Sequence, residues 1–488
     1  MDDEHIVSIH DEIELHSRKV VRSIEAGEGS SGAGQHRPAT AMEVKIEMLK
    51  RAGAQPGAVQ ASKIQKVIFL LRDHKCFVKY FEPKVASIGP IHHGNPKYEL
   101  GERYKLRLAY EFVKGFSCNI NGNTLDDDII SNLYGKIKKE IKQLRGCFEE
   151  EVTKNYDDEA LAWILFVDGC AILQYIFCAA PPTLTASNKF SELNIKNDSV
   201  AFAQQDLFLL ENQVPYRLLK LLMRYSGKEA ELNESIERFI GSVTYQQTKP
   251  QQKQRDPTHL LDLLRTRLLG PPPGRKAEPS SSRCPFTHQE DPDWQTYRNV
   301  QELKAAGIHL KRSKNDSYLG NISFTRRFGF GFYPGYLWLP PITVDDSTGP
   351  KFMNLIAYEM CLDFENDFGI SSYLSFLDSL IDEANDVKYM RKARVLHNFL
   401  GSDQEVADLF NAIGTDLVPN PEAYKDVKIQ IQKYYDTHWM TYMAQFRHDH
   451  FSSPWTIIAF LGVLLVLALT AVQAWFAVFP HSSDNGKK

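Results

Sequence analysis

The 488-residue chain lacks the short motifs that mark the common catalytic sites. It has no phosphate-binding loop of the G-x-x-x-x-G-K-[ST] type, no H-E-x-x-H zinc motif, no G-x-S-x-G nucleophile turn and no strand-borne G-x-G-x-x-G fingerprint. Its seven cysteines are scattered and form no C-x-x-C pair, which argues against a disulfide framework or a zinc site. We therefore expect no cofactor and no metal. An enzyme is disfavoured without being excluded.

Positive charge is not in excess either. The net charge of −4 provides no basic field for nucleic acid, so we expect no nucleic-acid partner. The N-terminus, "MDDEHIVSIHDEIELHS", is acidic and lacks the apolar core of a secretory signal.

One long stretch near the C-terminus has no charge at all. From Trp455 to Phe479 every residue is uncharged, and fourteen of them are Leu, Ile, Val or Phe. A helix rising about 1.5 Å per residue over this stretch exceeds the roughly 30 Å hydrocarbon core of a bilayer. Trp455 and Trp475 lie towards its ends, where aromatic rings prefer the headgroup level, and Leu464 and Leu467 lie near its centre. The sequence predicts a transmembrane helix that anchors the chain in a lipid bilayer; the alternative is a buried core helix.

Only a short polar tail follows this stretch, so it leaves the ribosome after nearly everything else. We therefore expect a single-pass membrane protein of the plasma membrane or an endomembrane, with its bulk in the cytosol. Flanking charges do not decide the orientation, because basic residues occur on both sides of the segment. A cell-surface orientation stays open.

Composition suggests six parts of the chain. They are a Gly/Ser/Ala-rich mobile N-terminal arm (1–62), an N-terminal helical lobe (63–269), a Pro/Ser-rich linker or insertion (270–295), a C-terminal lobe (296–453), the transmembrane helix (454–480) and a polar tail (481–488).

Helical periodicity dominates both lobes. Apolar residues recur at helical spacing between charged ones from Ile137 to Phe148, which predicts a buried stripe. A longer pattern over 371–396 predicts one helix, with Ser371 or Ser372 as its cap. Aromatic and β-branched residues with Gly and Pro punctuation over 321–346 predict a few short strands. The expected fold class is mainly α, a large helical domain with a small antiparallel β element and one C-terminal transmembrane helix.

Three acidic residues on the predicted 371–396 helix share one face. Asp378, Asp382 and Asp386 follow one another at i, i+4 steps and could attract a divalent cation. A solvated face paired with the Lys and Arg of the following turns is the interpretation we favour.

Polar residues within apolar runs are the candidate site residues. Glu211, Asn212 and Gln213 interrupt a run that is otherwise apolar from Leu207 to Met223, and such groups need partners when buried. They could end one helix while Pro215 starts the next. We favour a structural polar network over a general acid or base with its orienting groups.

Two other segments join this candidate network. His92 and His93 lie in the turn-rich "VASIGPIHHGNP", and adjacent side chains on an extended chain point apart, so loop hydrogen bonding is favoured over a shared metal. Asp168 lies in an apolar stretch with Cys170 close by, as in a base or a nucleophile, but no His follows to activate either. Asp168 is therefore interpreted as a helix-packing position.

Several segments together resemble a plant family called domain of unknown function 247. They are "VASIGPIHHG", "YDDEALAWILFVDGCAIL", "DLFLLENQVPYRLL", "NLIAYEMC", "SYLSFLDSLIDEANDVKYM", "LGSDQEVADLFN" and the stretch from "YYDTHWMTYMAQF" through the C-terminal apolar run. The resemblance covers Ile64 to Phe479. It departs at Ile68, where the family usually carries a proline.

This resemblance implies a plant membrane protein and supplies no catalytic residues. Some grass members of the family are regarded as pollen-side determinants of self-incompatibility, acting through specific recognition. The expected function is therefore membrane-anchored protein–protein recognition or signalling, with a protein partner. The alternatives are a membrane-tethered enzyme using Glu211, Asp168 or the His92–His93 pair, and a membrane scaffold.

Overall fold

The structure is a computed structural model. It describes residues 42, 45, 46, 50, 62–73, 75–117, 126–181, 189–245, 255–271, 299–313, 318–326, 334–364, 367–415, 417–435 and 454–478. The chain divides into two compact units, residues 1–60 and 61–488, and the described part of the second unit up to residue 435 is called the body. Most of the predicted arm, most of the predicted insertion and the predicted polar tail lie outside the described residues.

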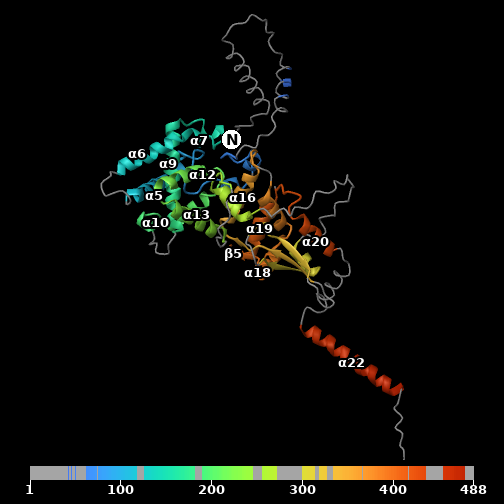
Figure 1. Cartoon of the computed structure of the whole chain (residues 1–488). Helices are drawn as coiled ribbons and strands as arrows, with labels where there is room; N and C mark the ends of the chain where they lie inside the picture. The colour runs from blue at the N-terminus through green and yellow to red at the C-terminus, as the bar shows by residue number, and fades with distance from the viewer. Residues whose placement is uncertain are drawn as a thin grey trace, which may run out of the picture. The chain divides into compact units, whose positions relative to one another are not determined.

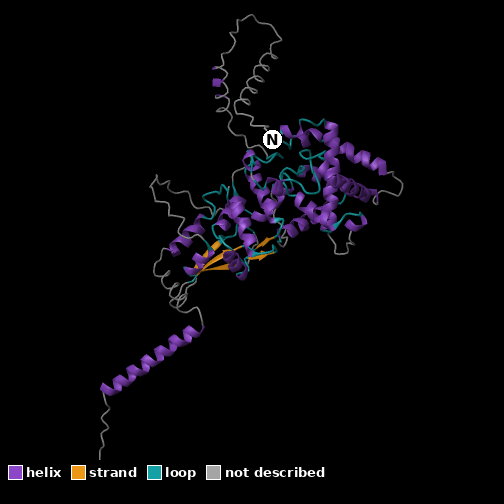
Figure 2. Cartoon of the chain, turned by 180° about the vertical axis from the view of Figure 1, so that it is seen from behind, coloured by secondary structure: helices purple, strands orange, loops and turns teal. Residues whose placement is uncertain are grey.

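Helices make up most of the described chain (Figure 2). Up to residue 271 they are α3 (Phe69–Arg72), α4 (Phe77–Phe81), the 3-10 turn η1 (Pro96–Tyr98), α5 (Glu99–Ser117), α6 (Asp126–Lys139), α7 (Ile141–Arg145), α8 (Glu150–Thr153), α9 (Asp158–Ala179), α10 (Lys189–Glu192), α11 (Asn197–Asp206), α12 (Tyr216–Ser226), α13 (Glu229–Thr244) and α14 (Leu260–Leu269).

The rest of the described chain combines helices with two small sheets. The helices are α15 (Val300–Ala305), α16 (Thr348–Glu359), α17 (Gly369–Asp378), α18 (Ala384–Lys392), α19 (Asp403–Gly414), α20 (Lys425–Tyr435) and α22 (Pro454–Val478). The strands are β1 (Ile308–Arg312), β2 (Ser323–Arg326), β3 (Gly335–Leu339), β4 (Ile342–Val344) and β5 (Leu396–Asn398). The prediction of a mainly α fold with a small β element is confirmed. The strand pairing is mixed, because β2 runs antiparallel to β3 whereas β1–β3 and β4–β5 are parallel.

Helix α9 is the centre of the N-terminal half. The Asp157 side chain caps it by accepting a hydrogen bond from the Ala160 N–H, and Asp158 and Glu159 in its first turn suit the helix dipole. It packs against α5, α6, α12 and α13 (Figure 1). A Cβ at Gly169 would lie 2.6 Å from Leu222 Cδ1, so this glycine allows α9 and α12 to approach closely.

The predicted apolar stripes are buried, but one predicted helix is broken. Ile137, Ile141, Leu144 and Phe148 are all in the core, as predicted. The prediction of one helix over 371–396 is wrong: α17 ends at Asp378 and α18 begins at Ala384. A capping box between Glu383 and Asp386 starts the second helix, and Phe368 rather than Ser371 or Ser372 precedes the first. The three aspartates therefore do not share one helical face.

Buried polar contacts tie the start of the body to residues far along the chain. The Asp363 carboxylate accepts hydrogen bonds from the Lys63 N–H and the Gln65 side-chain amide, across 300 and 298 residues. Asn354 on α16 donates to the Tyr80 carbonyl and accepts from the Leu210 N–H. The halves on either side of the predicted insertion are thus joined by hydrogen bonds as well as by apolar packing.

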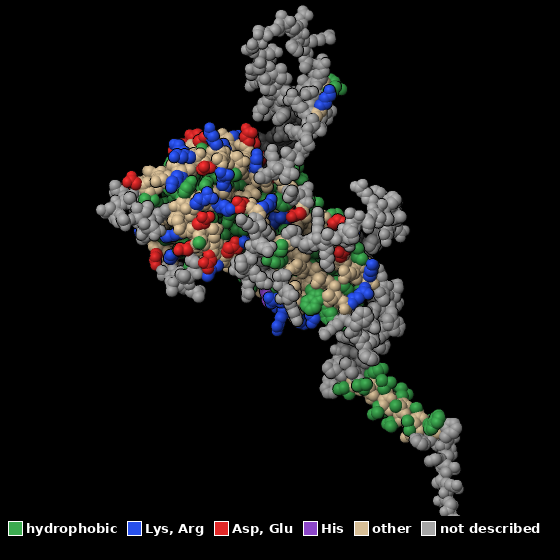
Figure 3. Space-filling view, viewed as in Figure 1, with side chains coloured by type: hydrophobic (Ala, Val, Ile, Leu, Met, Phe, Trp, Pro, Cys, Tyr) green, Lys and Arg blue, Asp and Glu red, His purple; other side chains and the backbone are tan. Residues whose placement is uncertain are grey.

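Among the residues that the structure describes, two helices are long and apolar enough to span a membrane, but their surroundings differ. Most of the apolar length of α9 (83%) is buried in the protein, so α9 is a core helix. Within α22, the window from Ile458 to Trp475 has no buried residue, and Figure 3 shows its surface covered by hydrophobic side chains. Helix α22 is therefore a candidate membrane span, and it contains Leu464, Leu467 and Trp475 as exposed residues.

Candidate functional site

The segment from Lys84 to His93 is held by side chains from distant parts of the chain. At the end of α11, the Asp206 carboxylate accepts hydrogen bonds from the N–H groups of Lys84, Val85 and Ala86 at 2.8–3.0 Å. The Asn212 side chain holds the same segment, because it accepts a hydrogen bond from the Ile88 N–H at 2.7 Å and donates one to the Ala86 carbonyl. Backbone groups that no helix or strand satisfies thus find their partners in two buried side chains.

A buried ion pair binds the backbone of the next part of the segment. Asp168 on α9 lies 2.6 Å from the Lys105 ammonium of α5 and accepts a 2.7 Å hydrogen bond from the Gly89 N–H. Lys105 also donates to the Ser87 carbonyl and lies 2.8 Å from the Glu102 carboxylate. Burial lowers the pKa of Lys105, but the two carboxylates more than offset this, so its pKa is raised and the ammonium is retained.

Glu211 connects the same segment to the start of the body. Its carboxylate accepts from the Val67 N–H at 2.8 Å, pairs with Arg72 and lies 3.3 Å from His92 Nε2. Burial favours the neutral acid, but His92, Arg72 and the Val67 N–H outweigh it and hold the pKa of Glu211 below its ordinary value. This carboxylate is charged at neutral pH, and Arg72 is partly exposed beside it.

Gln213 fixes the loop that carries these groups. Its amide donates to the Leu207 and Leu209 carbonyls and accepts from the Leu261 N–H at the start of α14. Its backbone carbonyl faces Gly89, where an added Cβ would lie only 2.5 Å from the oxygen. Gly89 has a φ of +72°, which side chains disfavour.

Gly89→Ala should therefore destabilise the body more than Gly94→Ala. Both glycines have positive φ, and each substitution costs about 1 kcal/mol for that reason. At Gly94 nothing lies within 4 Å of the added Cβ, whereas at Gly89 the Gln213 carbonyl must move. We expect an extra loss of about 1–3 kcal/mol for Gly89→Ala, measured by urea unfolding of the full chain in detergent. Equal losses at the two positions would contradict the close approach.

The polar side chains that hold residues 84–93 are called the cluster, and they include five of the six polar residues singled out from the sequence. Asp168, Asn212 and Gln213 bond to backbone groups, and Glu211 contacts His92. The sixth, His93, packs its ring edge-on against Tyr156, whose hydroxyl donates to the Pro90 carbonyl at 3.0 Å. Cys170, by contrast, is buried in α9, and burial raises the pKa of its thiol, which disfavours the thiolate that a nucleophile needs.

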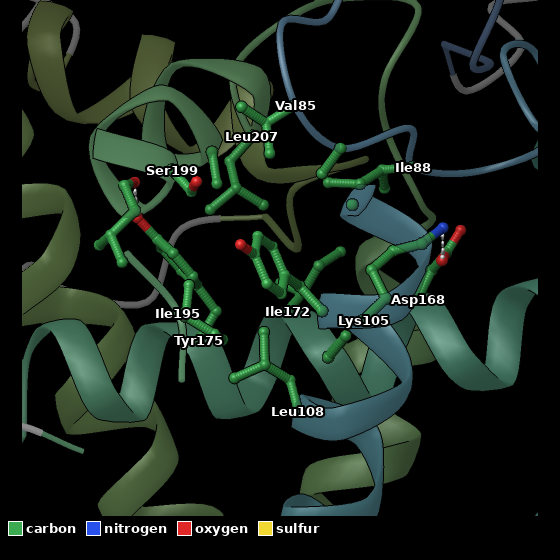
Figure 4. Close-up of a pocket in the computed structure, with 16 residues that line it drawn as sticks. Val85, Ile88, Lys105, Leu108, Asp168, Ile172, Tyr175, Ile195, Ser199 and Leu207 are labelled. Carbon is green, nitrogen blue, oxygen red and sulfur yellow. Dashed lines mark hydrogen bonds and ion pairs between the residues drawn. The ribbon is translucent and has the colours of Figure 1, made fainter. Parts of the chain in front are cut away.

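A small cavity lies beside the cluster, between α5, α9 and α11. Figure 4 shows the Lys105–Asp168 pair at one end of it and Ile195 and Ser199 towards the other. Its volume is about 50 Å³ and most of its lining is apolar. Since one water needs roughly 10–15 Å³, the cavity has room for a few waters or a very small molecule. It is too small for a typical metabolite.

Several buried polar residues are missed by the sequence reasoning. Lys105 lies on the amphipathic helix α5, where charged residues usually face solvent, and Asp206 follows two glutamines at the end of α11. Arg265 interrupts the apolar and mostly buried α14, and it donates two hydrogen bonds to the buried Glu359 of α16. Glu359 in turn accepts from the Ile370 and Ser371 N–H groups at the start of α17.

His259 is another buried group without a signal in the sequence. Its Nδ1 accepts a 3.1 Å hydrogen bond from the Asp262 N–H and so caps α14. Burial lowers the pKa of His259 from 6.5 to about 4, although the negative charges of Asp262 and Asp363 act to raise it. The folded protein therefore keeps this imidazole neutral.

Stability should consequently fall as the solution is acidified. Between pH 6.5 and pH 4 the unfolded chain protonates His259 and the folded chain does not, so His259 alone lowers the free energy of unfolding by about 1.5 kcal/mol from pH 6.5 to 5. His259→Asn keeps a capping side chain and removes the titration. Urea unfolding at both pH values should show a smaller pH dependence for this variant; an unchanged dependence would refute the assignment.

The described residues contain no group of three or more His, Cys, Asp or Glu side chains placed to hold a metal ion. His92 and His93 make different contacts, with Glu211 and Tyr156 respectively. Asp378 is half-buried, and burial together with Asp382 raises its pKa. Asp386 is committed to the capping box of α18.

Comparison with known proteins places the chain in a family. UPF0481 protein At3g47200 of Arabidopsis thaliana is 28% identical over 432 residues, covering 83% of this chain and 84% of the relative. Putative UPF0481 protein At3g02645 of the same plant is 22% identical over 480 residues, covering 82% and 87%. No solved structure matches the chain. The family model DUF247, described as a plant protein of unknown function, matches residues 64–469, and the chain belongs to this family.

Proposed function

We propose that this chain is a membrane-anchored plant protein that recognises another protein. Helix α22 is the anchor, and the helical body is the recognition module. Anchoring raises the effective concentration of both partners at one surface, so modest affinity suffices. Signalling through such a complex, including recognition of the kind implicated in grass pollen self-incompatibility, belongs to this proposal.

The observation that carries the proposal is how the buried polar groups are used. Asp206, Asn212 and Asp168 each direct their oxygens at backbone N–H groups of residues 84–89. A general acid or base needs an oxygen or nitrogen within reach of a substrate. These oxygens instead hold a loop in one conformation, which gives a rigid scaffold on which exposed loops can vary.

One contact favours a second candidate, a membrane-tethered enzyme. His92 Nε2 lies 3.3 Å from the charged Glu211, and the imidazole is partly exposed, as in a histidine oriented by a carboxylate. The adjacent cavity of about 50 Å³ does not favour a substrate of ordinary size. Recognition therefore remains the better-supported function.

Cross-linking in intact plant membranes separates these candidates. The full chain and its Glu211→Gln and His92→Gln variants should be cross-linked, and the second protein identified by mass spectrometry. If Glu211 and His92 only stabilise the fold of the body, the amount of cross-linked partner per folded chain should stay within about twofold of wild type. A loss of more than tenfold with intact folding would favour direct chemistry at His92 and Glu211. Cross-links only to a second copy of the chain would favour the alternative function, that of a membrane scaffold.

Orientation is tested separately by protease protection on sealed membranes. One epitope is placed before Met1 and another after Lys488. Digestion of the first and protection of the second, from the cytosolic side, is the expected result and places the partner inside the cell. The opposite pattern would make the body extracytosolic and the recognition a cell-surface event.

A further inference from the structure

A basic hollow lies on the surface between α15 and α18, far in sequence from the cluster around residues 84–93. Its volume is about 420 Å³, and three lysines line it: Lys304 from α15, and Lys388 and Lys392 from α18. In Figure 3, Lys and Arg side chains gather at the lower edge of the body, where Figure 1 labels α18 and β5. The chain as a whole is acidic, with a net charge of −4, so this gathering runs against its average charge.

The fold places these lysines side by side. Lys388 and Lys392 are separated by one helical turn and therefore project from the same face of α18. Lys304 reaches the same hollow from α15, and its ammonium lies 5.2 Å from the centre of the Tyr389 ring. Asn385 and Gln301 add amide groups to the lining.

The two acidic residues of the hollow make hydrogen bonds at the start of α18, although the buried Asp386 Oδ1 has no hydrogen-bond partner among the described residues. Asp386 is buried and accepts hydrogen bonds from the Asp382 and Glu383 N–H groups at 3.1 and 3.0 Å. Glu383 completes the capping box of α18 by accepting the Asp386 N–H. Among the described residues, neither acid forms a salt bridge with Lys304, Lys388 or Lys392, whereas the adjacent Arg391 pairs with Asp403 at 2.6 Å.

We propose that this hollow binds a small phosphorylated polyol. Ammonium groups bind phosphate oxygens as point charges, and the three lysines outnumber the two carboxylates that line the hollow. The side-chain amides of Asn385 and Gln301 suit hydroxyl groups, and the volume lies within the range of small-molecule sites, about 300–1,000 Å³. The same chemistry is found in a soluble inositol phosphate and in a phosphorylated lipid headgroup. The site is independent of the proposed protein recognition.

The test uses the full chain in nanodiscs of neutral phosphatidylcholine. Radiolabelled inositol 1,4,5-trisphosphate should bind saturably with one site per chain, and binding should weaken as salt rises. In a second arm, nanodiscs that contain phosphatidylinositol 4,5-bisphosphate should block the soluble probe if the headgroup is the ligand source. Blockade assigns the site to the lipid headgroup; undiminished binding of the probe assigns it to a soluble compound.

Matched variants distinguish the hollow from general attraction. The triple variant Lys304→Gln, Lys388→Gln, Lys392→Gln should weaken binding at least 100-fold. The control Lys139→Gln, Lys142→Gln, Lys196→Gln changes the net charge equally at exposed lysines elsewhere and should change binding less than threefold. Arginine at positions 304, 388 and 392 keeps the charge and should retain binding if folding is intact. No saturable binding by wild type, or equal losses in both glutamine triples, overturns the proposal.

Discussion

Replacing Asp168 by Leu should destabilise the body by about 3–5 kcal/mol, because it leaves the buried Lys105 ammonium without its main partner. The Lys105 ammonium and the Asp168 carboxylate lie 2.6 Å apart, and both side chains are almost fully buried. The substitution also leaves the Gly89 N–H, which donates to Asp168 at 2.7 Å, without its acceptor. Urea unfolding of the full chain in detergent measures the loss.

The control for this prediction removes both charges together. The double variant Lys105→Met, Asp168→Leu buries apolar groups of similar size, and such replacements of buried ion pairs are often close to neutral. It should therefore be more stable than Asp168→Leu alone, although the Gly89 N–H and the Ser87 carbonyl still lack a partner. A loss below about 1 kcal/mol for the single variant, or a double variant that is less stable still, would show that the pair is not an essential buried contact.

Replacing Leu464 and Leu467 by Arg should release the protein from membranes. Both residues lie near the middle of α22, and each charge at the bilayer centre costs about 2.5–3.5 kcal/mol, or roughly 5–7 kcal/mol together. Fractionation after carbonate extraction should find the wild type in the membrane pellet and the double variant in the supernatant.

The matched control replaces the same two leucines by Phe, which keeps the helix apolar and should leave the protein in the pellet. Retention of the arginine variant in the pellet would mean that something other than α22 holds the chain to membranes. Release of the phenylalanine variant would mean that the shape of α22, and not its hydrophobicity, decides retention.

Apolar periodicity predicted the helical character of the body and many of its core positions, because residues at helical spacing need an apolar neighbour whatever their tertiary contacts. It failed at the break between α17 and α18. Leu380 and Ile381 continue the apolar pattern across the break, so the pattern alone does not reveal it. The break is made by hydrogen bonds between Glu383 and Asp386. Both residue types also occur on helix surfaces, so their presence does not by itself indicate a helix start.

The candidate site was predictable where polarity conflicts with its surroundings. Glu211, Asn212 and Gln213 interrupt an apolar run and are buried, with partners. Lys105 and Asp206 do not stand out, because Lys105 lies on an amphipathic helix, where charged residues usually face water, and Asp206 follows two glutamines. Their burial depends on the segment 84–93, whose position no local pattern specifies. Partners 63 residues away for Lys105, or 120 and more for Asp206, cannot be identified from periodicity.

The hydrogen bonds from Lys63 and Gln65 to Asp363 have a consequence for the timing of synthesis. Lys63 cannot reach its partner until a further 300 residues have been translated. At about 5–20 residues per second this takes roughly 15–60 s, far longer than a helix or a short loop needs to form. During that interval the first segment of the body is without its final partner and is open to chaperones.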